Sequence, residues 1–188
     1  MRLTGGRARG RRLKGPRGRL IRPTGDRVRE ALFDILGCRV QGARFLDVYS
    51  GTGAVGCEAL SRGAAQAILL ERERDALKLI GENLRLAPGS GTGRIMAGDA
   101  CRSLRELARR QAIFDVIFLD PPYDAPDLSA ALGLAARILS PEGVLVLEHR
   151  STLEVALPET TLLDRARTYR YGDSSLTVYR PAGGPGRS

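Results

Sequence analysis

The spacing of apolar positions along the chain predicts where its helices and strands lie. Within residues 28–36 the apolar side chains recur three and four positions apart, which is the stripe of one helix face. Thr24 or Asp26 can cap this helix at its start, and Gly37 ends it. Beyond Gly37, short continuous apolar runs alternate with stretches of helical period, the arrangement typical of an α/β protein.

The apolar runs predict seven strands, at residues 44–48, 66–71, 94–98, 114–119, 144–148, 163–171 and 175–180. Helical periods predict four further helices, at residues 54–62, 74–86, 101–110 and 128–139. Strands that alternate with helices form right-handed βαβ units and therefore a parallel sheet. The last two strands flank Gly172-Asp173 and predict an antiparallel hairpin. We therefore expect a seven-stranded, mostly parallel sheet with an antiparallel C-terminal hairpin.

The chain is expected to form one domain, because 188 residues are enough for a single core. Residues 23–180 would be that domain, and residues 181–188 a disordered tail. Residues 1–22 form a basic N-terminal extension, either a hairpin or a loose arm, and their glycine-rich sequence does not decide between the two. The segment Gly89-Ser90-Gly91-Thr92-Gly93 is interpreted as a surface insertion.

Charge is concentrated at the start of the chain. The net charge is +9, and residues 1–29 hold eleven Lys or Arg against one acid, Asp26. Such an arm suits a polyphosphate partner, because each phosphate that it neutralises releases counterions. A solubilising leader is the alternative. The residues that would contact RNA are Arg7, Arg9, Arg11, Arg12, Lys14, Arg17, Arg19 and Arg22.

Several classes of protein are excluded by composition. No apolar run approaches the roughly 20 residues that span a bilayer, and the basic N-terminus has no apolar core of a secretory signal. Cys38, Cys57 and Cys101 lie far apart and, with the single His149, form no zinc-binding spacing. We expect a cytoplasmic monomer with reduced cysteines and no metal.

A glycine turn follows the first predicted strand. Gly51, Gly53 and Gly56 fit the pattern G-x-G-x-x-G, and Glu71 follows Gly51 by 20 residues, where an acid would hold a ribose hydroxyl. Any nucleoside cofactor needs this close backbone approach. Asp47, at the end of the strand, would repel a pyrophosphate but could orient the cationic amino-acid part of S-adenosylmethionine. The turn therefore favours a methyltransferase over a dehydrogenase.

A second motif, Asp120-Pro121-Pro122-Tyr123, follows the buried strand at 114–119. The prolines fix the turn, so that the Asp120 carboxylate and a proline carbonyl can accept the two hydrogens of an exocyclic amino group. Tyr123 can stack on the base that carries this group. The alternative is a plain turn with a packed tyrosine.

These motifs belong to longer segments that resemble one family. The segments are Gly5-Gly6 with Gly10-Arg11, residues 22–33, 46–54, 58–64 and 114–123. Together they resemble the RsmD family of bacterial 16S ribosomal RNA guanine-N2 methyltransferases, and the resemblance extends over residues 2–180.

The resemblance implies a Rossmann-like class I methyltransferase that acts on small-subunit ribosomal RNA or the 30S particle. Its cofactor, S-adenosylmethionine, would be bound by Asp47, Ser50, Gly51, Gly53, Glu71, Asp99 and Ala100. Within this set Glu71 would take the ribose hydroxyls and Asp99 the adenine. The guanine would be held by Asp120, Pro121, Pro122 and Tyr123.

Two other functions are weighed beside this one. An adenine-N6 methyltransferase on DNA or RNA shares the acid-Pro-Pro-aromatic motif, but usually needs a target-recognition domain for which 188 residues leave little room. A non-catalytic assembly factor that grips ribosomal RNA would not need the acids of both motifs.

Four side chains outside the motifs are interpreted from their position alone. We assign His149 to the surface or the rim of the site and Asn83 to an ordinary helix position. Arg27 and Arg29 are interpreted as reaching the active site or, equally, as part of a solvated helix face.

Overall fold

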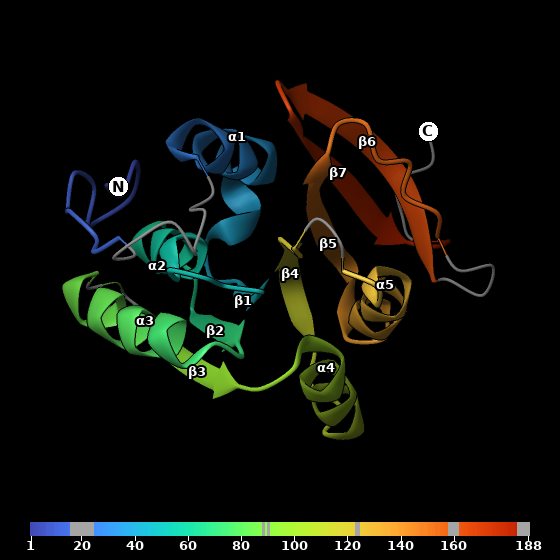
Figure 1. The fold of residues 1–188 in the computed structure, drawn as a ribbon, viewed down its shortest axis with the longest axis horizontal. Coiled ribbons are helices and arrows are strands. Elements are labelled where there is room, and N and C mark those ends of the chain that lie inside the picture. Colours follow the sequence, from blue (N-terminus) through green and yellow to red (C-terminus); the bar gives the residue numbers. More distant parts are fainter. Residues whose placement is uncertain (16–24, 88, 90, 123–124, 158–161, 184–188) are drawn as a thin grey trace.

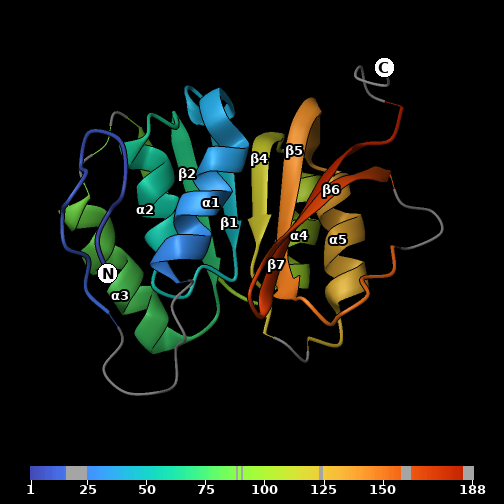
Figure 2. The same cartoon turned by 90° about the horizontal axis from the view of Figure 1, so that it is seen from above.

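The computed structural model describes residues 1–15, 25–87, 89, 91–122, 125–157 and 162–183. A seven-stranded sheet lies between two layers of helices (Figures 1 and 2). The strand order is β3-β2-β1-β4-β5-β7-β6. Strands β1 to β5 pair in parallel, and β7 pairs antiparallel with both β5 and β6. The predicted mostly parallel sheet with an antiparallel hairpin is confirmed.

The strands are β1 (Arg44–Val48), β2 (Gln66–Glu71), β3 (Thr92–Ala97), β4 (Phe114–Leu119), β5 (Leu139–Arg150), β6 (Leu163–Tyr171) and β7 (Ser174–Pro181). The helices are α1 (Asp26–Leu36), the 3-10 helix η1 (Gly37–Val40), α2 (Ala54–Ser61), α3 (Arg74–Leu86), α4 (Ala100–Arg109) and α5 (Leu128–Ala136). Helices α1, α2 and α3 pack on one face of the sheet, and α4 and α5 pack on the other.

Some predicted boundaries were wrong. The residue at the N-cap of α1 is Gly25, and Asp26 is the first residue of the helix, so Asp26 is not the cap. The helix predicted at 128–139 ends at Ala136 because Leu139 already pairs with Phe114 as the first residue of β5. A register shift between Phe114 and Val116 then lets β5 continue for twelve residues. Pairing with β4 therefore places Leu139 in a strand, although the local spacing of apolar residues predicts a helix there.

Residues 91–93 of the glycine-rich link lead into the sheet and are not a surface insertion, whereas Gly89 is exposed and Ser90 lies outside the described residues. A Cβ atom on Gly91 would lie 2.1 Å from the carbonyl oxygen of Ala64, and one on Gly93 would lie 2.6 Å from the Leu84 side chain. Strand β3 begins at Thr92, two residues before the predicted start. These glycines therefore let the chain pass close to its neighbours as it enters the sheet.

The basic N-terminal segment is folded against the domain over residues 1–14. Its two halves pair through Leu3 N to Arg11 O at 3.0 Å and Gly10 N to Leu3 O at 2.8 Å. Leu3, Ala8 and Leu13 are buried and pack in a cluster that includes residues of α2. Five of the residues predicted to contact RNA are exposed on this segment: Arg7, Arg9, Arg11, Arg12 and Lys14. The other three, Arg17, Arg19 and Arg22, lie outside the described residues. Residues 184–188 of the predicted C-terminal tail also lie outside them.

A buried carboxylate in α2 holds this segment in place. Glu58 accepts hydrogen bonds from the backbone N of Gly5 at 2.7 Å and of Thr4 at 2.9 Å. Its charge is balanced by Arg62 at 2.9 Å and by Arg29 at 3.5 Å. Arg29 is fully buried and also pairs with Asp26 at 3.0 Å. Neither interpretation of Arg29 holds: it is a buried structural cation, because tertiary packing places α1 against this segment.

His149 is likewise an interior residue. It lies in β5 with 8% of its surface exposed, and its Nε2 lies 2.8 Å from the hydroxyl oxygen of Thr177 on β7. Burial lowers the pKa of its imidazole. The assignment of His149 to the surface or rim was wrong, since the antiparallel strand β7 covers it.

Candidate active site

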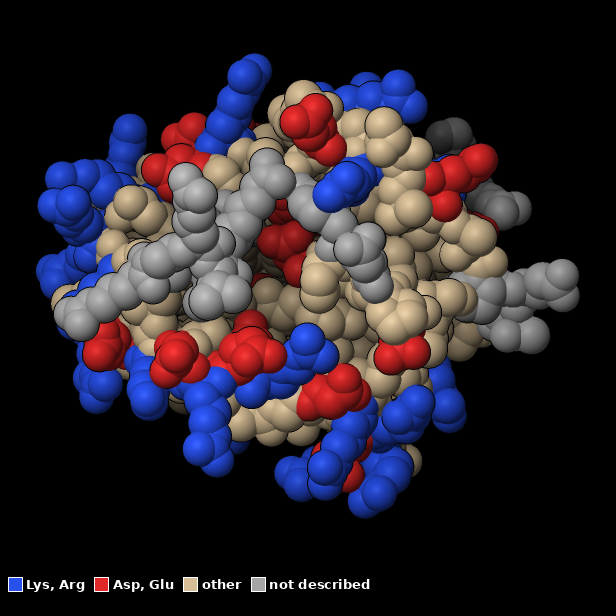
Figure 3. Space-filling view, in the orientation of Figure 1, with Lys and Arg blue, Asp and Glu red and all other residues tan. Residues whose placement is uncertain are grey.

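A cleft of about 780 Å³ opens at the carboxyl ends of β1 and β4. In Figure 3 it is the hollow near the centre of the molecule, with carboxylates inside it. Parallel sheets place their ligand sites at this edge, where neighbouring strands diverge to opposite layers. The predicted residues that line the cleft are Ser50, Gly51, Glu71, Asp99, Ala100, Asp120, Pro121 and Pro122. Asp47 and Gly53 lie behind its wall, and Tyr123 lies outside the described residues.

The glycine turn is held in a compact shape between β1 and α2. Tyr49 has a φ of 65°, an uncommon value for a residue with a side chain, and Gly53 has a φ of 73°. A Cβ on Gly53 would lie 3.0 Å from Leu69 and 3.1 Å from Ile80. Gly53 therefore lets α2 pack closely on β2 and α3, while Ser50 and Gly51 form the surface of the cleft.

Asp47 lies beneath this turn. Its carboxylate is 1% exposed and accepts a hydrogen bond from the backbone N of Gly56 at 2.9 Å. Burial raises the pKa of Asp47 to about 7, helped by the nearby carboxylates of Asp120 and Glu71 and opposed by the bond from Gly56. The side chain thus supports the start of α2 from inside the domain.

Glu71 joins the turn to the next strand. Its Oε2 accepts the backbone N of Gly51 at 2.8 Å, and its Oε1 accepts those of Arg72 at 2.7 Å and Glu73 at 2.9 Å. Three backbone donors fix the orientation of this carboxylate at the edge of the cleft. A rigid acceptor in this position can bind vicinal hydroxyl groups with little loss of side-chain entropy.

Asp99 lies at the next strand end along the sheet. It is the N-cap of α4, where its Oδ1 accepts the backbone N of Arg102 at 2.9 Å. Ala100, the first residue of α4, is buried and lines the cleft beside it. The carboxylate and the helix start therefore face the same space as Glu71.

The acid-Pro-Pro turn forms another part of the cleft lining. Asp120 follows β4, and its backbone N donates to Val48 O at 3.3 Å, which ties it to the end of β1. The carbonyl of Pro122 accepts a hydrogen bond from Ala125 N at 3.0 Å. The turn is thus closed on itself, and Asp120, Pro121 and Pro122 line the same cleft as Ser50 and Gly51.

Sequence reasoning missed one side of the cleft. Gly25 and Val28, at the start of α1, and Tyr171 and Ser174, from the turn between β6 and β7, also line it. Because β7 runs antiparallel to β5, its first residues return to the carboxyl edge of the parallel strands. No local motif marks these residues, and only the strand order could have indicated them.

The fold and the site together define a Rossmann-like methyltransferase. The glycine turn and the acid-Pro-Pro turn follow two adjacent central strands, β1 and β4. The antiparallel strand β7 lies between β5 and β6. A family model described as Conserved hypothetical protein 95 matches residues 1–180. The chain belongs to this family, and its predicted resemblance to the RsmD family is confirmed.

Curated relatives cover most of the chain. It is 37% identical over 186 residues to the "Putative rRNA methyltransferase YlbH" of Bacillus subtilis (strain 168), an alignment that covers 97% of this chain and 100% of that protein. It is 30% identical to "Ribosomal RNA small subunit methyltransferase D" of Haemophilus influenzae over 89% of this chain and 88% of that protein. The protein of the same name from Escherichia coli (strain K12) is 39% identical over 65% of this chain and 60% of that protein.

Solved structures agree with these relatives. "Putative methyltransferase yhhF from Escherichia coli" superposes with a TM-score of 0.82 at 33% identity, over 97% of this chain and 98% of that one. The hypothetical protein TTHA0928 of Thermus thermophilus superposes with a TM-score of 0.81 at 35% identity, over 96% of this chain and 99% of that one.

The described residues lack two features, a membrane-spanning helix and a metal-binding cluster. None of their helices combines the length and the apolar character needed to cross a membrane. Nor do three or more His, Cys, Asp or Glu side chains gather there in a group that could hold a metal ion.

Proposed function

We propose that this chain transfers a methyl group from S-adenosylmethionine to the N2 amino group of a guanine in small-subunit (16S) ribosomal RNA. The observation that carries the proposal is one cleft lined both by the glycine turn and by the Asp120-Pro121-Pro122 turn, which follow adjacent strands. Relatives over most of the chain are named as ribosomal RNA methyltransferases, which supports RNA as the substrate.

The described residues fit S-adenosylmethionine. Glu71 offers the ribose hydroxyls a carboxylate held by three backbone donors, and Asp99 with Ala100 borders the space for the adenine. The backbone of Ser50 and Gly51 would pass close to the amino-acid part. Asp47, beneath the turn, would orient this cationic part through the charge of its carboxylate. Bound there, the cofactor would supply an electrophilic methyl group to the amino nitrogen of the guanine, whose displaced proton would pass to water.

Asp120 would position the nucleophile. Its carboxylate accepts an N–H of the guanine amino group and so directs the nitrogen lone pair across the cleft. Tyr123 would stack on the flipped base. Alignment and a preorganised charge are enough for this reaction, because the amino proton is lost readily once the nitrogen has been methylated.

The test is methyl transfer from labelled cofactor to small-subunit RNA and to 30S particles, followed by mapping of the modified nucleotide. N2-methylguanine in small-subunit RNA is the expected product. Methylated adenine would instead show the adenine-N6 activity, and RNA binding without transfer would show an assembly factor. As a cofactor control, Gly51→Val should abolish calorimetric binding of S-adenosylmethionine by filling the space at the turn, and NAD should not bind the unaltered protein.

A ribosomal substrate also implies the cell compartment and the partners. We propose that the enzyme works in the cytoplasm as a monomer and holds its RNA through the exposed basic side chains of residues 7–14. Sedimentation of the purified protein with and without small-subunit RNA would test the monomeric state and the RNA binding.

A further inference from the structure

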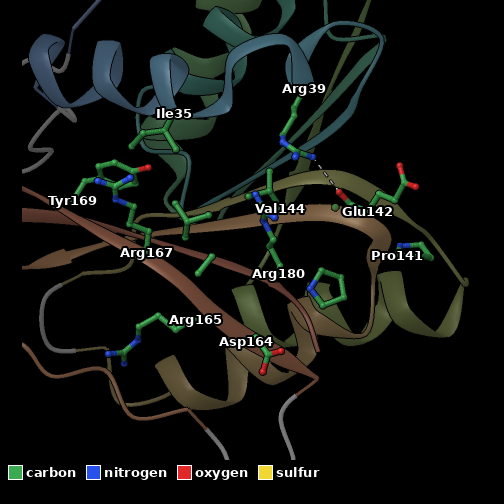
Figure 4. Close-up of a pocket in the computed structure, with 14 residues that line it drawn as sticks. Ile35, Arg39, Pro141, Glu142, Val144, Asp164, Arg165, Arg167, Tyr169 and Arg180 are labelled. Carbon is green, nitrogen blue, oxygen red and sulfur yellow. Dashed lines mark hydrogen bonds between the residues drawn. The ribbon is translucent and has the colours of Figure 1, made fainter. Parts of the chain in front are cut away.

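A second cavity lies on the α1 side of the sheet, away from the cleft. Its volume is about 880 Å³, and it lies between the end of α1 with η1 and the strands β5, β6 and β7 (Figure 4). Its lining includes Ile35, Arg39, Val144, Arg167, Tyr169 and Arg180. We call it the arginine groove.

The groove carries an excess of positive charge. Four arginines line it against two acids, Glu142 and Asp164. Arg165 is engaged elsewhere, since its guanidinium donates to the carbonyl of Val155 at 2.7 Å. Arg39, Arg167 and Arg180 are exposed, and none of the three forms an ion pair with a described carboxylate.

An aromatic ring lies beside these cations. The guanidinium of Arg167 lies 5.0 Å from the centre of the Tyr169 ring. Figure 4 shows these two side chains together in the groove. Arg39 approaches from the opposite wall and donates to the carbonyl of Glu142 at 3.4 Å. Arginines for phosphates beside a flat aromatic surface for a base are the groups that bind single-stranded nucleic acid.

The groove and the active-site cleft are lined by different parts of the same two elements. On α1, Val28 lines the cleft and Ile35 lines the groove. On β6, Tyr171 lines the cleft, and Tyr169 and Arg167 line the groove. Residues two apart on a strand share a face, and the four steps along the strand from Tyr171 to Arg167 span about 13 Å. A chain that leaves the cleft between α1 and β6 therefore enters the arginine groove.

The groove lies on the opposite side of the cleft from the N-terminal basic segment. In Figure 1 residues 1–14 lie beside α2 and α3, whereas β6 and β7 lie on the other side of α1. The cleft lies between the N-terminal segment and the groove, and a target nucleotide held in it is joined to RNA on both its 5′ and its 3′ side. The N-terminal segment can bind only one of these two flanks.

We propose that the arginine groove binds the single-stranded RNA on one side of the target nucleotide, with phosphates against Arg39, Arg167 and Arg180. This proposal rests on RNA being the substrate. It assigns the C-terminal hairpin a part in substrate binding as well as in closing the sheet. The core of a protein interface is depleted in charged residues, whereas the exposed side chains of the groove are mainly charged.

The test compares two variants that each lose two exposed arginines. Arg167→Ala/Arg180→Ala alters the groove, and Arg94→Ala/Arg105→Ala alters β3 and α4 on other parts of the surface. Binding of small-subunit RNA made in vitro is measured over a series of salt concentrations. A plot of the logarithm of the binding constant against the logarithm of the salt concentration gives a slope, the log–log salt slope. In the groove variant its magnitude should fall by about 1.4, which is about 0.7 for each single-strand phosphate that is no longer neutralised. Arg39→Ala, on the opposite wall, should lower it by about 0.7.

Catalysis provides the second measurement. The groove variant should raise the KM for RNA while kcat and S-adenosylmethionine binding stay within twofold of the unaltered protein. Equal salt slopes in the groove and control variants would overturn the proposal. If RNA binding depends on the groove but no methyl transfer occurs, the proposed function is contradicted. The role of the groove in RNA binding would still stand. If the protein transfers methyl groups but the groove variant matches the control variant in RNA binding and KM, only the proposed role of the groove is overturned.

Discussion

Asn83 and Lys14 are joined by a pair of hydrogen bonds between α3 and the N-terminal segment. The backbone N of Lys14 donates to Asn83 Oδ1 at 2.8 Å, and Asn83 Nδ2 donates to the Lys14 carbonyl at 3.0 Å. The same Nδ2 donates to the carbonyl of Thr52 in the glycine turn at 2.9 Å. One buried amide thus connects the basic segment to the cofactor-side turn. The interpretation of Asn83 as an ordinary helix residue was wrong, because its partners lie far away in sequence.

Asn83→Ala should lower the free energy of unfolding by about 1 to 3 kcal/mol, the cost of leaving buried backbone groups without partners. Lys78→Ala on the same helix is the control, because Lys78 is exposed and forms only a surface ion pair with Asp75. Its effect should stay within about 0.5 kcal/mol. Urea unfolding measures both, and equal midpoints would show that the amide network contributes nothing.

Glu58→Gln should destabilise the protein by about 3 to 5 kcal/mol, because it leaves the buried Arg29 without its buried counter-charge. The N-terminal segment should also become sensitive to trypsin, since Glu58 binds the backbone of Thr4 and Gly5. Glu106→Gln is the matched control. It breaks an exposed pair with Arg110 and should cost less than about 1 kcal/mol. A Glu58 variant as stable and as protease-resistant as this control would refute the anchoring role.

Asp47 should make stability depend on pH. Its pKa is raised from 3.8 to about 7 in the folded protein, so between these values the folded state holds a proton that the unfolded state has lost. Stability therefore falls as pH rises from about 4 to about 7, by up to about 1.4 kcal/mol per pH unit.

Asp47→Asn should remove this slope, because an amide oxygen can still accept the bond from Gly56 and carries no charge. Urea unfolding between pH 4 and pH 8 measures it, and the variant should exceed the unaltered protein in stability most clearly at pH 8. Asp75→Asn, at an exposed position of α3, is the control and should keep the slope. Parallel curves for the Asp47 variant and the unaltered protein would show that this carboxyl titrates normally.

The exposed cations of the N-terminal segment should contribute to RNA binding without affecting the cofactor. Deleting the segment is a poor test, because Leu3, Ala8 and Leu13 are part of the core. Arg9→Ala/Arg11→Ala instead removes two charges from exposed positions. The log–log salt slope for RNA should fall by about 1.4 to 1.8. An unchanged slope would make the segment a solubilising leader.

Asp120→Ala should slow single-turnover methyl transfer by about 100- to 1000-fold, the usual cost of losing one preorganised electrostatic partner. Tyr123→Ala should cost about 1 to 3 kcal/mol, the value of one base–aromatic stack. Tyr123→Phe should keep most activity, because stacking needs only the ring. Calorimetry should give unchanged cofactor affinity in all three. Near-normal turnover by the Asp120 variant would mean that the base is held elsewhere.

The sequence by itself determined the elements and the two motifs at their ends. Short apolar-rich runs located β1, β2 and β4 to the residue, because strands buried on both faces carry mostly apolar side chains. The glycine turn and the Asp120-Pro121-Pro122 turn were also evident. Each is a local signal, since backbone freedom and backbone restriction are properties of glycine and proline themselves.

Only the tertiary structure decided which charges are buried and what closes the cleft. Arg29 and Glu58 have no local pattern that distinguishes them from solvated helix residues, and they are buried because the N-terminal segment folds over both. Tyr171 reaches the cleft because β7 inserts antiparallel between β5 and β6. Burial and strand order depend on contacts between residues distant in sequence, which the period of a single segment does not record.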